Sequence, residues 1–583
     1  MWPNSLSISV NHPGFLAMRM LDGKVVWVHP QWAADESLSA DVDLFDVFRK
    51  RFACMIPNAG RFASLRFDHS APVQLLAERY GGCGIGYNGG GVRCGNLGNY
   101  QIKGIGRNLL AGAHTDVHHT YGGLKAAHAC HEAIYAVVLN HILPLGAAKV
   151  YGVLLTGADA AYRKGLEPGW GALLVRESVV RPGNFLRAGN FSPAAEDRHL
   201  LADDVARVRV AMRELMRQLG GADQFIVMLS RFLKNCANQC TFARIARLMH
   251  GALTPSNICI DGRWLDLTNT TFLPSRDNHG GGNRDTPCFY EEMGQPLVIA
   301  REFFDTFAKY NGLRLDFGPL EKYFDDVSAQ YLRRHVCHLF SIPFERLPVA
   351  ARVHLGRIAK HVTTILSSGR VVYDTWPTVL PADDPISSFI EFLFMSYFDR
   401  PRAAVRSPGM STWIETNCCG VVDTFNQMIE ASWRGEGAVE PLRCYVFRLA
   451  LLSIRPARLA ELFFKWRMES TLWAAIEGEP SNIEALMGHY MGACGWIFSK
   501  NRSEITVLRS DAICVEYRGG QQLFVRCDAT RDQWRACGSA EFSSLAARTG
   551  PVDLLGLDCS VYLAKVADLL QVLDTREELN RVA

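Results

Sequence analysis

A glycine-rich segment followed by a lysine is the first feature of the sequence that could handle phosphate. Nine of the 18 residues from Gly81 to Gly98 are glycine, a density that no stable helix tolerates. Glycines let backbone amides turn toward an anion without a side chain in the way. Lys103 ends a short extended run that begins at Asn99. These residues predict a phosphate-covering loop and a phosphate-binding lysine, although an ordinary surface loop explains the glycines about as well.

A glutamate in the next predicted helix could orient this lysine. The residue pattern predicts a helix from Gly123 to His141, and Glu132 lies within it. A strand lysine and a glutamate on the following helix form the ion pair with which kinase-like folds hold their phosphate-binding lysine. Any such lysine and glutamate can also be solvated surface residues. The pair therefore needs a second signal before it indicates a nucleotide site.

The second signal is the segment from His250 to Asp266. A kinase catalytic loop runs His-Arg-Asp, reaches an asparagine five residues after the aspartate, and is followed by a hairpin and a metal-binding aspartate. Here Asn257 and Asp266 occupy the two metal positions, and Asp261-Gly262 between two short runs predicts a tight type I′ hairpin. Ala252 stands where the catalytic aspartate would be, and alanine cannot accept a proton. A structural hairpin with a solvated aspartate is the alternative.

Several stretches, in order along the chain, resemble the selenoprotein O family of kinase-like protein adenylyltransferases. The resemblance covers roughly Tyr80 to Asp266, which is under half of the chain. Ordered agreement over several stretches is more specific than any single motif. The matching stretches are Tyr80–Gly86 with the family's Tyr-Ala-Gly-His-Gln-Phe-Gly, Gln101–Arg107 with Gln-Leu-Lys-Gly-Ala-Gly-Arg, His131–Glu132 with Arg-Glu, Gly171–Arg176 with Gly-Ala-Val-Leu-Val-Arg, Arg187–Phe191 with Arg-Phe-Gly-His-Phe, and His250–Asn257 with His-Gly-Val-Met-Asn-Thr-Asp-Asn.

This resemblance implies an activity and a set of site residues. The family binds ATP in a flipped orientation that buries the terminal phosphates, so AMP is transferred rather than a phosphoryl group. The implied cofactors are ATP and Mg²⁺, and the implied acceptor is a protein or peptide. The resemblance implies that ATP is contacted by Gly82, Gly84, Gly86 and Arg107, and that its buried phosphates are held by Lys103, Arg176 and Arg187, with Arg181 able to substitute for either arginine. It also implies that Mg²⁺ is bound by Asn257 and Asp266. The catalytic candidates are Lys103, Glu132 and Asp266.

Departures from the family pattern indicate a divergent member. Ser256 replaces the acidic residue that the family places before the metal-binding asparagine, and Tyr121-Gly122-Gly123 replaces its Asp-Gly-Arg. A carboxylate acceptor needs less help from a base than a hydroxyl, because it is already ionised at neutral pH. One version of the prediction is therefore activation of a peptide C-terminus. A branch that resembles selenoprotein O takes part in microcin maturation, where it works with an acyltransferase-like partner to attach a siderophore to a peptide.

Two other functions remain open from the sequence. One is phosphoryl transfer with an unconventional base, and the other is a pseudokinase scaffold that binds ATP without turnover. Release of pyrophosphate distinguishes AMP transfer from phosphoryl transfer. Partner binding that survives loss of Asp266 favours the scaffold.

Other residues with metal-binding side chains give weaker signals. Loop histidines are more often solvated than metal-bound, and the 17 cysteines show no Cys-x-x-Cys spacing, so they read as reduced thiols. The candidates weighed for metal are His114, Asp116, His118 and His119, with Cys236, Cys240, Cys418 and Cys419 as the only close cysteine pairs.

The elements that position these residues indicate an α+β protein with a bilobal protein-kinase-like fold and a large, mainly helical C-terminal region. We expect an N-terminal lobe over 1–200, a lobe with the catalytic and metal loops over 201–320, and the helical region with a small late β-meander over 321–583. The patterns predict strands at Val25–Val28, Asn99–Lys103, Ala172–Arg176, Glu504–Arg509, Ala512–Arg518 and Gln521–Cys527, and helices near Val42–Phe52, Ala202–Leu219, Asp325–Leu339 and Leu459–Met468.

The overall charge argues against a nucleic-acid partner. The 583-residue chain has 62 Lys and Arg against 59 Asp and Glu, a formal charge of +3, which is too small for non-specific binding of nucleic acid. Polar residues interrupt the longest apolar region, Ala133 to Ala161, so we expect no membrane span. The start of the chain shows no secretory signal pattern, and the expected location is the cytoplasm.

Overall fold

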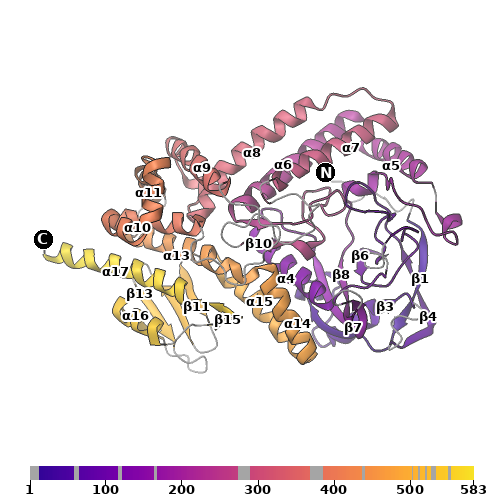
Figure 1. Ribbon diagram of the computed structural model, residues 1–583, viewed down its shortest axis with the longest axis horizontal. Coiled ribbons are helices and arrows are strands. Elements are labelled where there is room, and N and C mark those ends of the chain that lie inside the picture. The colour runs from indigo at the N-terminus through magenta and orange to yellow at the C-terminus, as the bar shows by residue number, and fades with distance from the viewer. Residues whose placement is uncertain are drawn as a thin grey trace.

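The computed structural model describes residues 12–57, 65–115, 121–162, 167–201, 203–273, 289, 291–367, 385–435, 440–501, 503–509, 513–518, 522–526, 534–548 and 553–582. The chain is mixed α and β, with an antiparallel sheet in its N-terminal region and a mainly helical C-terminal part. Figure 1 places the large sheet at one end of the molecule and the final helix at the other. The predicted α+β class with a helical C-terminal part is confirmed.

The predicted lysine strand lies in the interior of an eight-stranded sheet. The strand order is β2-β7-β8-β6-β5-β4-β1-β3, and neighbouring strands are antiparallel. On β6, Lys103 lies opposite Cys94 of β5 and Leu174 of β8. The strands are β1 (Gly14–Met20), β2 (Lys24–Val28), β3 (Cys54–Met55), β4 (Phe67–Leu76), β5 (Cys94–Leu97), β6 (Tyr100–Lys103), β7 (Val150–Tyr162) and β8 (Pro168–Glu177).

Two short helices cover one face of this sheet. These are α1 (Pro30–Asp35) and α2 (Leu44–Phe52), and Asp43 caps α2 by accepting hydrogen bonds from the backbone of its first turn. Trp32 and Phe48 pack edge to face with ring centroids 4.8 Å apart, and both side chains are fully buried. This aromatic cluster anchors the lead-in segment to the sheet.

The other face of the sheet is covered by α4 (Ala126–Ile142), the helix predicted from Gly123 to His141. It packs against β7 and β8 and also against two C-terminal helices, α14 (Lys465–Gly478) and α15 (Ile483–Ile497). Of its 17 residues, 13 are buried, which is typical of a helix enclosed by protein on most sides. The C-terminal helices therefore hold the helix that carries Glu132 against the sheet.

A helical layer follows the sheet and contains the two short strands of the second motif. β9 (Leu248–Met249) pairs antiparallel with β10 (Thr271–Phe272), and the loop with Asn257 and Asp266 runs between them. Asp203 caps the first helix of this layer, and Gly220 ends it in the left-handed conformation. The helices are α5 (Asp204–Leu219), α6 (Ala222–Ile245), α7 (Gln295–Asn311) and α8 (Gly318–Leu339).

The C-terminal part combines helices with a small late sheet. The three predicted late strands are confirmed as β11, β12 and β13, and a fourth, β14, was not predicted. Residues 519–521, between β12 and β13, lie outside the described residues. The remaining elements are α9 (Arg352–Ser367), α10 (Pro385–Arg406), α11 (Pro408–Asn417), α12 (Val421–Gly435), α13 (Leu442–Leu459), β11 (Glu504–Arg509), β12 (Cys514–Arg518), β13 (Gln522–Arg526), β14 (Arg535–Cys537), α16 (Ser539–Arg548), β15 (Asp553–Leu554), β16 (Leu557–Asp558) and α17 (Ser560–Val582).

The helix predicted over Leu459–Met468 is not continuous. α13 ends at Leu459, a short 3₁₀ turn follows, and α14 begins after Phe464, whose backbone is extended. Groups from the rest of the protein satisfy the backbone at this break, because the Lys465 amide donates to the Thr271 hydroxyl over 2.9 Å. Tertiary contacts thus overrode the helical spacing of the sequence.

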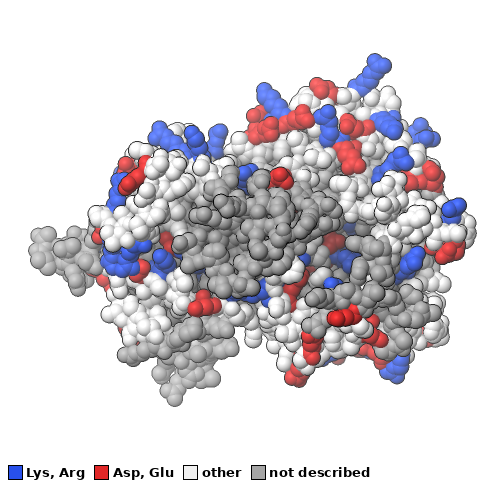
Figure 2. Space-filling model, in the orientation of Figure 1, with Lys and Arg blue, Asp and Glu red and all other residues white. Residues whose placement is uncertain are grey.

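The surface charges agree with the small formal charge. Figure 2 shows Lys and Arg side chains interspersed with Asp and Glu around the visible edges of one face. Within the described part of the chain, no helix combines the length and apolar character needed to cross a membrane.

Candidate nucleotide-binding site

The predicted lysine, glutamate and aspartate meet inside the molecule. Lys103 Nζ lies 2.7 Å from Glu132 Oε2 and 2.6 Å from Asp266 Oδ1. The Lys103 and Glu132 side chains are each 1% exposed, and that of Asp266 is 24% exposed. A buried charge needs partners of opposite sign, and here one ammonium group serves two carboxylates. The surface alternative for Lys103 and Glu132 is therefore excluded.

Arg176 extends this contact along the sheet. Its Nη1 donates to Glu132 Oε1 over 2.6 Å, so Glu132 is shared between an arginine and Lys103. Its Nε and Nη2 donate to Gln101 Oε1 over 2.9 and 2.7 Å. Gln101 and Arg176 are directly opposite on β6 and β8, so the strand register itself brings this pair together.

The contacts continue to the segment that precedes the glycine loop. Gln101 donates to Glu78, and Glu78 Oε2 also accepts from Arg181 Nη2 over 2.8 Å. Arg181 Nη1 then donates to the Ser256 carbonyl over 2.7 Å. A continuous chain of contacts thus runs from Asp266 through Lys103 and across the sheet to Ser256, the neighbour of Asn257.

Asp266 is held ionised by the cations around it. Burial alone would raise the pKa of its carboxyl, but Lys103, Arg176 and Arg93 outweigh burial and hold that pKa well below its usual range. Its backbone is left-handed, with φ 59° and ψ 70°. A non-glycine residue in such a conformation costs on the order of 1–3 kcal/mol and is concentrated at functional sites. Asp266 is therefore a fixed carboxylate suited to a metal ion.

The asparagine of the second motif lies beside this carboxylate along the backbone. Asn257 Nδ2 donates to the Ala252 carbonyl over 2.9 Å, and the Leu265 amide donates to the Asn257 carbonyl over 3.1 Å. Because Leu265 directly precedes Asp266, the two predicted metal residues sit on adjacent backbone segments. Two oxygen-bearing side chains fit Mg²⁺, which completes its six ligands with waters and phosphate oxygens.

The turn between these two residues differs from the predicted one. A type I′ turn needs positive φ at both Asp261 and Gly262, but of the two only Gly262 has one, at 89°. The Cys259 amide bonds to the Arg263 carbonyl over 2.9 Å and the Gly262 amide to the Cys259 carbonyl over 2.9 Å. The connection is therefore a three-residue turn that ends in a left-handed glycine, and the type I′ prediction is wrong. Asp261 instead accepts a bond from Arg263, which stabilises the longer turn.

The glycine loop packs directly on the loop that carries Asn257. Gly82 and Gly84 have φ values of 90° and 87°, and a Cβ at these positions would lie 2.9 Å from Pro255 and from Thr254, respectively. Only glycine combines this backbone with so close an approach. Gly86 also has a positive φ, 59°, but a Cβ there would meet nothing within 4 Å. Gly82 and Gly84 are therefore required by the contact between the two loops, whereas Gly86 is required only by its turn.

Two predicted arginines lie outside the buried cluster. The side chains of Arg107 and Arg187 are exposed. Arg187 still lies beside the glycine loop through its backbone, because its carbonyl accepts a bond from the Gly82 amide over 3.0 Å. Of the arginines implied by the resemblance, the structure brings Arg176 and Arg181 into the cluster with Lys103.

The weaker metal candidates gain no support. His114 is exposed, and Asp116, His118 and His119 lie outside the described residues. Burial raises the pKa of the Cys236 and Cys240 thiols, which disfavours the thiolate that a metal needs. Over the described ranges, no group of three or more His, Cys, Asp or Glu side chains is placed to hold a metal ion.

Three cluster residues were missed from the sequence: Glu78, Gln101 and Arg93. Gln101 could have been found, because it is two residues from Lys103 on one strand and must point to the same face. Arg93 directly precedes β5, next to Cys94, which lies opposite Lys103, and the Arg93 carbonyl accepts a hydrogen bond from the Gly104 amide over 2.7 Å. Nothing in the sequence distinguished Glu78 or Arg93 from other charged residues.

Comparison with known protein families and with curated proteins finds no match to this chain.

Proposed function

We propose that this protein is an ATP- and Mg²⁺-dependent nucleotidyltransferase that moves AMP from ATP to a protein or peptide acceptor. The observation that carries the proposal is the buried Lys103, which contacts Glu132 at 2.7 Å and Asp266 at 2.6 Å. In kinase-like folds the same three residue types, in the same order along the chain, bind phosphate, orient the lysine and bind the metal.

The order of elements supports a kinase-like arrangement of the N-terminal region. The glycine loop connects β4 to β5, Lys103 lies on β6, and α4 with Glu132 follows before β7. A glycine-rich loop, a lysine strand and a glutamate helix in this order form the ATP-binding lobe of protein kinases. The loop with Asn257 and Asp266 would supply the two metal-binding oxygens from the second lobe.

The charge distribution favours AMP transfer over phosphoryl transfer. Lys103, Arg176 and Arg181 are each 1–2% exposed, so an anion that reaches them must be buried. A flipped ATP would place its β- and γ-phosphates among these cations and leave the α-phosphate toward solvent. The acceptor oxygen would then attack the α-phosphorus, the bond from that phosphorus to the bridging oxygen would break, and pyrophosphate would leave with its charge neutralised by arginine and Mg²⁺.

The missing base favours an acceptor that needs none. Ala252 and Ser256 occupy the two positions where an acid or base is expected. Among the described residues, the Ser256 hydroxyl hydrogen-bonds to Thr254 and Asn257. A hydroxyl acceptor must lose a proton, whereas a carboxylate is already ionised at neutral pH. We therefore propose that the acceptor is the C-terminal carboxylate of a peptide. In one version of this proposal, an acyltransferase-like partner then uses the activated peptide in microcin-siderophore maturation.

The test uses ATP labelled separately at the α- and γ-phosphates, with Mg²⁺ and candidate peptides. Asp266→Ala removes the metal carboxylate, and Asp261→Asn, in the turn that precedes Asp266, is the control. We expect transfer of the α-label with release of pyrophosphate by the wild type and by Asp261→Asn, and none by Asp266→Ala. Transfer of the γ-label would replace the proposal with phosphoryl transfer, and tight ATP binding without any transfer would favour a scaffold.

A further inference from the structure

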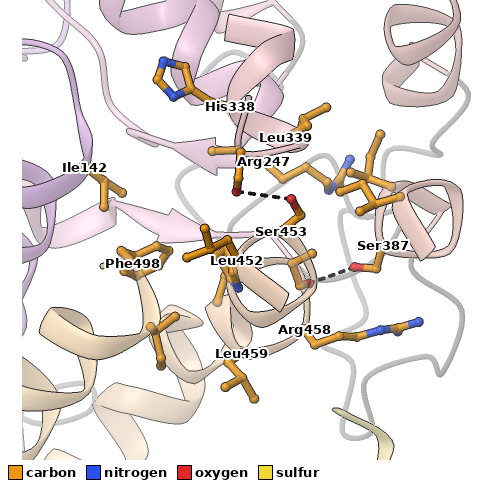
Figure 3. A pocket seen from close by; sticks show the side chains of 18 of the residues that line it. Ile142, Arg247, His338, Leu339, Ser387, Leu452, Ser453, Arg458, Leu459 and Phe498 are labelled. Atoms are coloured by element: carbon orange, nitrogen blue, oxygen red, sulfur yellow. Dashed lines mark hydrogen bonds between the residues drawn. The ribbon is translucent and has the colours of Figure 1, made fainter. Parts of the chain in front are cut away.

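A cavity of about 770 Å³ lies away from the Lys103 cluster, between the helical layer and the C-terminal part. Its walls come from α6, α8, α10, α13 and the β10 strand, and from the chain around Phe498. Figure 3 shows side chains from these elements facing one another, with Leu452 and Ser453 on one wall and Ser387 on another. A volume of this size is typical of small-molecule sites, which range over roughly 300–1,000 Å³.

Most of the wall is apolar. Aromatic and aliphatic side chains from separate parts of the chain meet there, and two serine hydroxyls of the wall, Ser453 on α13 and Ser387 on α10, are already bonded. Ser453 Oγ donates to the Leu449 carbonyl over 2.7 Å, and Ser387 Oγ donates to the Ala457 carbonyl over 2.8 Å. The apolar lining includes Ile142, Phe242, Phe272, Ile342, Leu452 and Phe498.

One side of the cavity is cationic. Arg334, His338 and Lys500 all line it and lie close enough to influence one another. Arg334 is paired with Glu345. Lys500 is an exposed side chain on the same side of the cavity, and it takes part in no ion pair between described residues. Burial, Lys500 and Arg334 together lower the pKa of His338 to about 4, so His338 is neutral at pH 7 and Lys500 carries the uncompensated charge.

We propose that this cavity binds a small amphipathic anion, with its apolar body against Phe272 and Phe498 and its carboxylate or phosphate head on Lys500. Charge complementarity selects an anion, because Lys500 lacks a carboxylate partner among the described residues. The volume and the apolar walls select a ligand with a hydrocarbon or aromatic body rather than a free inorganic ion. This inference is independent of the proposed AMP transfer.

The site has a structural relation to the loops described above. Arg247, which lines the cavity, directly precedes β9, and Leu273, which also lines it, directly follows β10. These two strands flank the segment with Asn257 and Asp266. A ligand in the cavity would therefore lie next to both ends of that segment.

Isothermal titration of the full-length protein tests the proposal with four probes below their micelle concentrations. Decanoate and decyl phosphate carry the two head groups, 1-decanol has the same tail without charge, and decyltrimethylammonium has the opposite charge. We expect one site per chain for at least one anion, with decanol about tenfold weaker and the cation weaker still. The tighter of the two anions identifies the head group.

Variants locate the binding. Lys500→Gln should weaken the anion about tenfold and leave decanol unchanged, while Lys24→Gln on the exposed edge of β2 should change neither. Ala457→Phe, which fills the cavity from the α13 wall, should abolish both. Binding of many molecules per chain, equal affinity for decanol and decanoate, an unaltered affinity in Lys500→Gln, or no binding at all would each overturn the proposal.

Discussion

Glu132 is the carboxylate on which the buried cluster depends, and its replacement by glutamine gives the sharpest test of the structure. The glutamate lies between two cations, with Lys103 Nζ at 2.7 Å and Arg176 Nη1 at 2.6 Å. Glu132→Gln keeps the shape of the side chain but removes its charge. Lys103 and Arg176 would then both remain charged and buried without the carboxylate that neutralises them in the wild type.

The expected cost follows from the burial of all three groups. The Lys103 and Glu132 side chains are each 1% exposed and that of Arg176 is 2% exposed. Breaking a buried ion pair by removing one partner costs about 3–5 kcal/mol. Lys103 keeps Asp266 and Arg176 keeps Gln101, so the lower end of this range, about 3 kcal/mol of the free energy of unfolding, is expected.

Urea denaturation with and without Mg²⁺-ATP is the appropriate assay. Glu177→Gln on β8 is the matched control, because Glu177 pairs with Arg263 at a site where the two side chains are 20% and 25% exposed. A partly exposed pair contributes about 1 kcal/mol or less. Equal destabilisation by Glu132→Gln and Glu177→Gln would refute the buried pair. A Glu132→Gln protein that is destabilised yet transfers the α-label normally would refute the role of Glu132 in orienting Lys103.

Three further outcomes follow from the same loops. Glu292 accepts hydrogen bonds from the backbone amides of His250 and Gly251, each over 2.8 Å, and burial raises its pKa to about 7. The wild type should therefore lose roughly 3 kcal/mol of unfolding free energy relative to Glu292→Gln as pH rises from about 4.5 to above 7. Urea denaturation across that range measures this loss, and a pH-independent difference would contradict it. Gly84→Val should lower the free energy of unfolding by about 1–3 kcal/mol and weaken ATP binding. Gly86→Asn should be tolerated, because asparagine accepts a left-handed backbone. Equal effects of the two substitutions on thermal unfolding would count against the contact between the glycine loop and Thr254. Ser256→Asp should add transfer to hydroxyl acceptors, seen as a new labelled product, and an unchanged product spectrum would argue against the missing-base explanation.

The elements near the cluster were predictable because their local signals agree with their tertiary surroundings. The structure has a loop at the glycine-rich segment Gly81–Gly91. It also has a short strand that ends at Lys103 and a helix that carries Glu132, both at or near their predicted positions. Local propensity and packing favour the same answer there. Strands β11 and β12 were predictable for the same reason, since alternating residues are buried on each of them, Ile505 and Val507 on β11 and Val515 and Tyr517 on β12.

The failures have a different origin, in contacts between distant segments. The break at Phe464 depends on the bond from Lys465 to Thr271, nearly two hundred residues away. The turn after Cys259 depends on its closing bond with Arg263 rather than on the Asp-Gly dipeptide alone. Glu78 belongs to the cluster because it accepts a hydrogen bond from Arg181, which is 103 residues further along the chain. No periodicity in the sequence connects these two residues. Long-range pairing of this kind leaves no periodic trace in one sequence.

The contacts of Lys103 determine whether a metal ion and a nucleotide would help or hinder each other's binding. Its ammonium contacts Asp266 Oδ1 at 2.6 Å, so a phosphate oxygen that approaches Lys103 competes with that carboxylate. Lys103 already contacts the Glu132 and Asp266 carboxylates, so a phosphate would be a third anion at one buried ammonium and would be strongly repelled. A magnesium ion held by Asp266 and Asn257 would remove this repulsion, because it would neutralise the carboxylate and supply positive charge for the phosphates. Under the proposed function, Mg²⁺ and ATP should therefore bind with positive coupling, and Asp266→Ala should let ATP bind without the metal while preventing transfer.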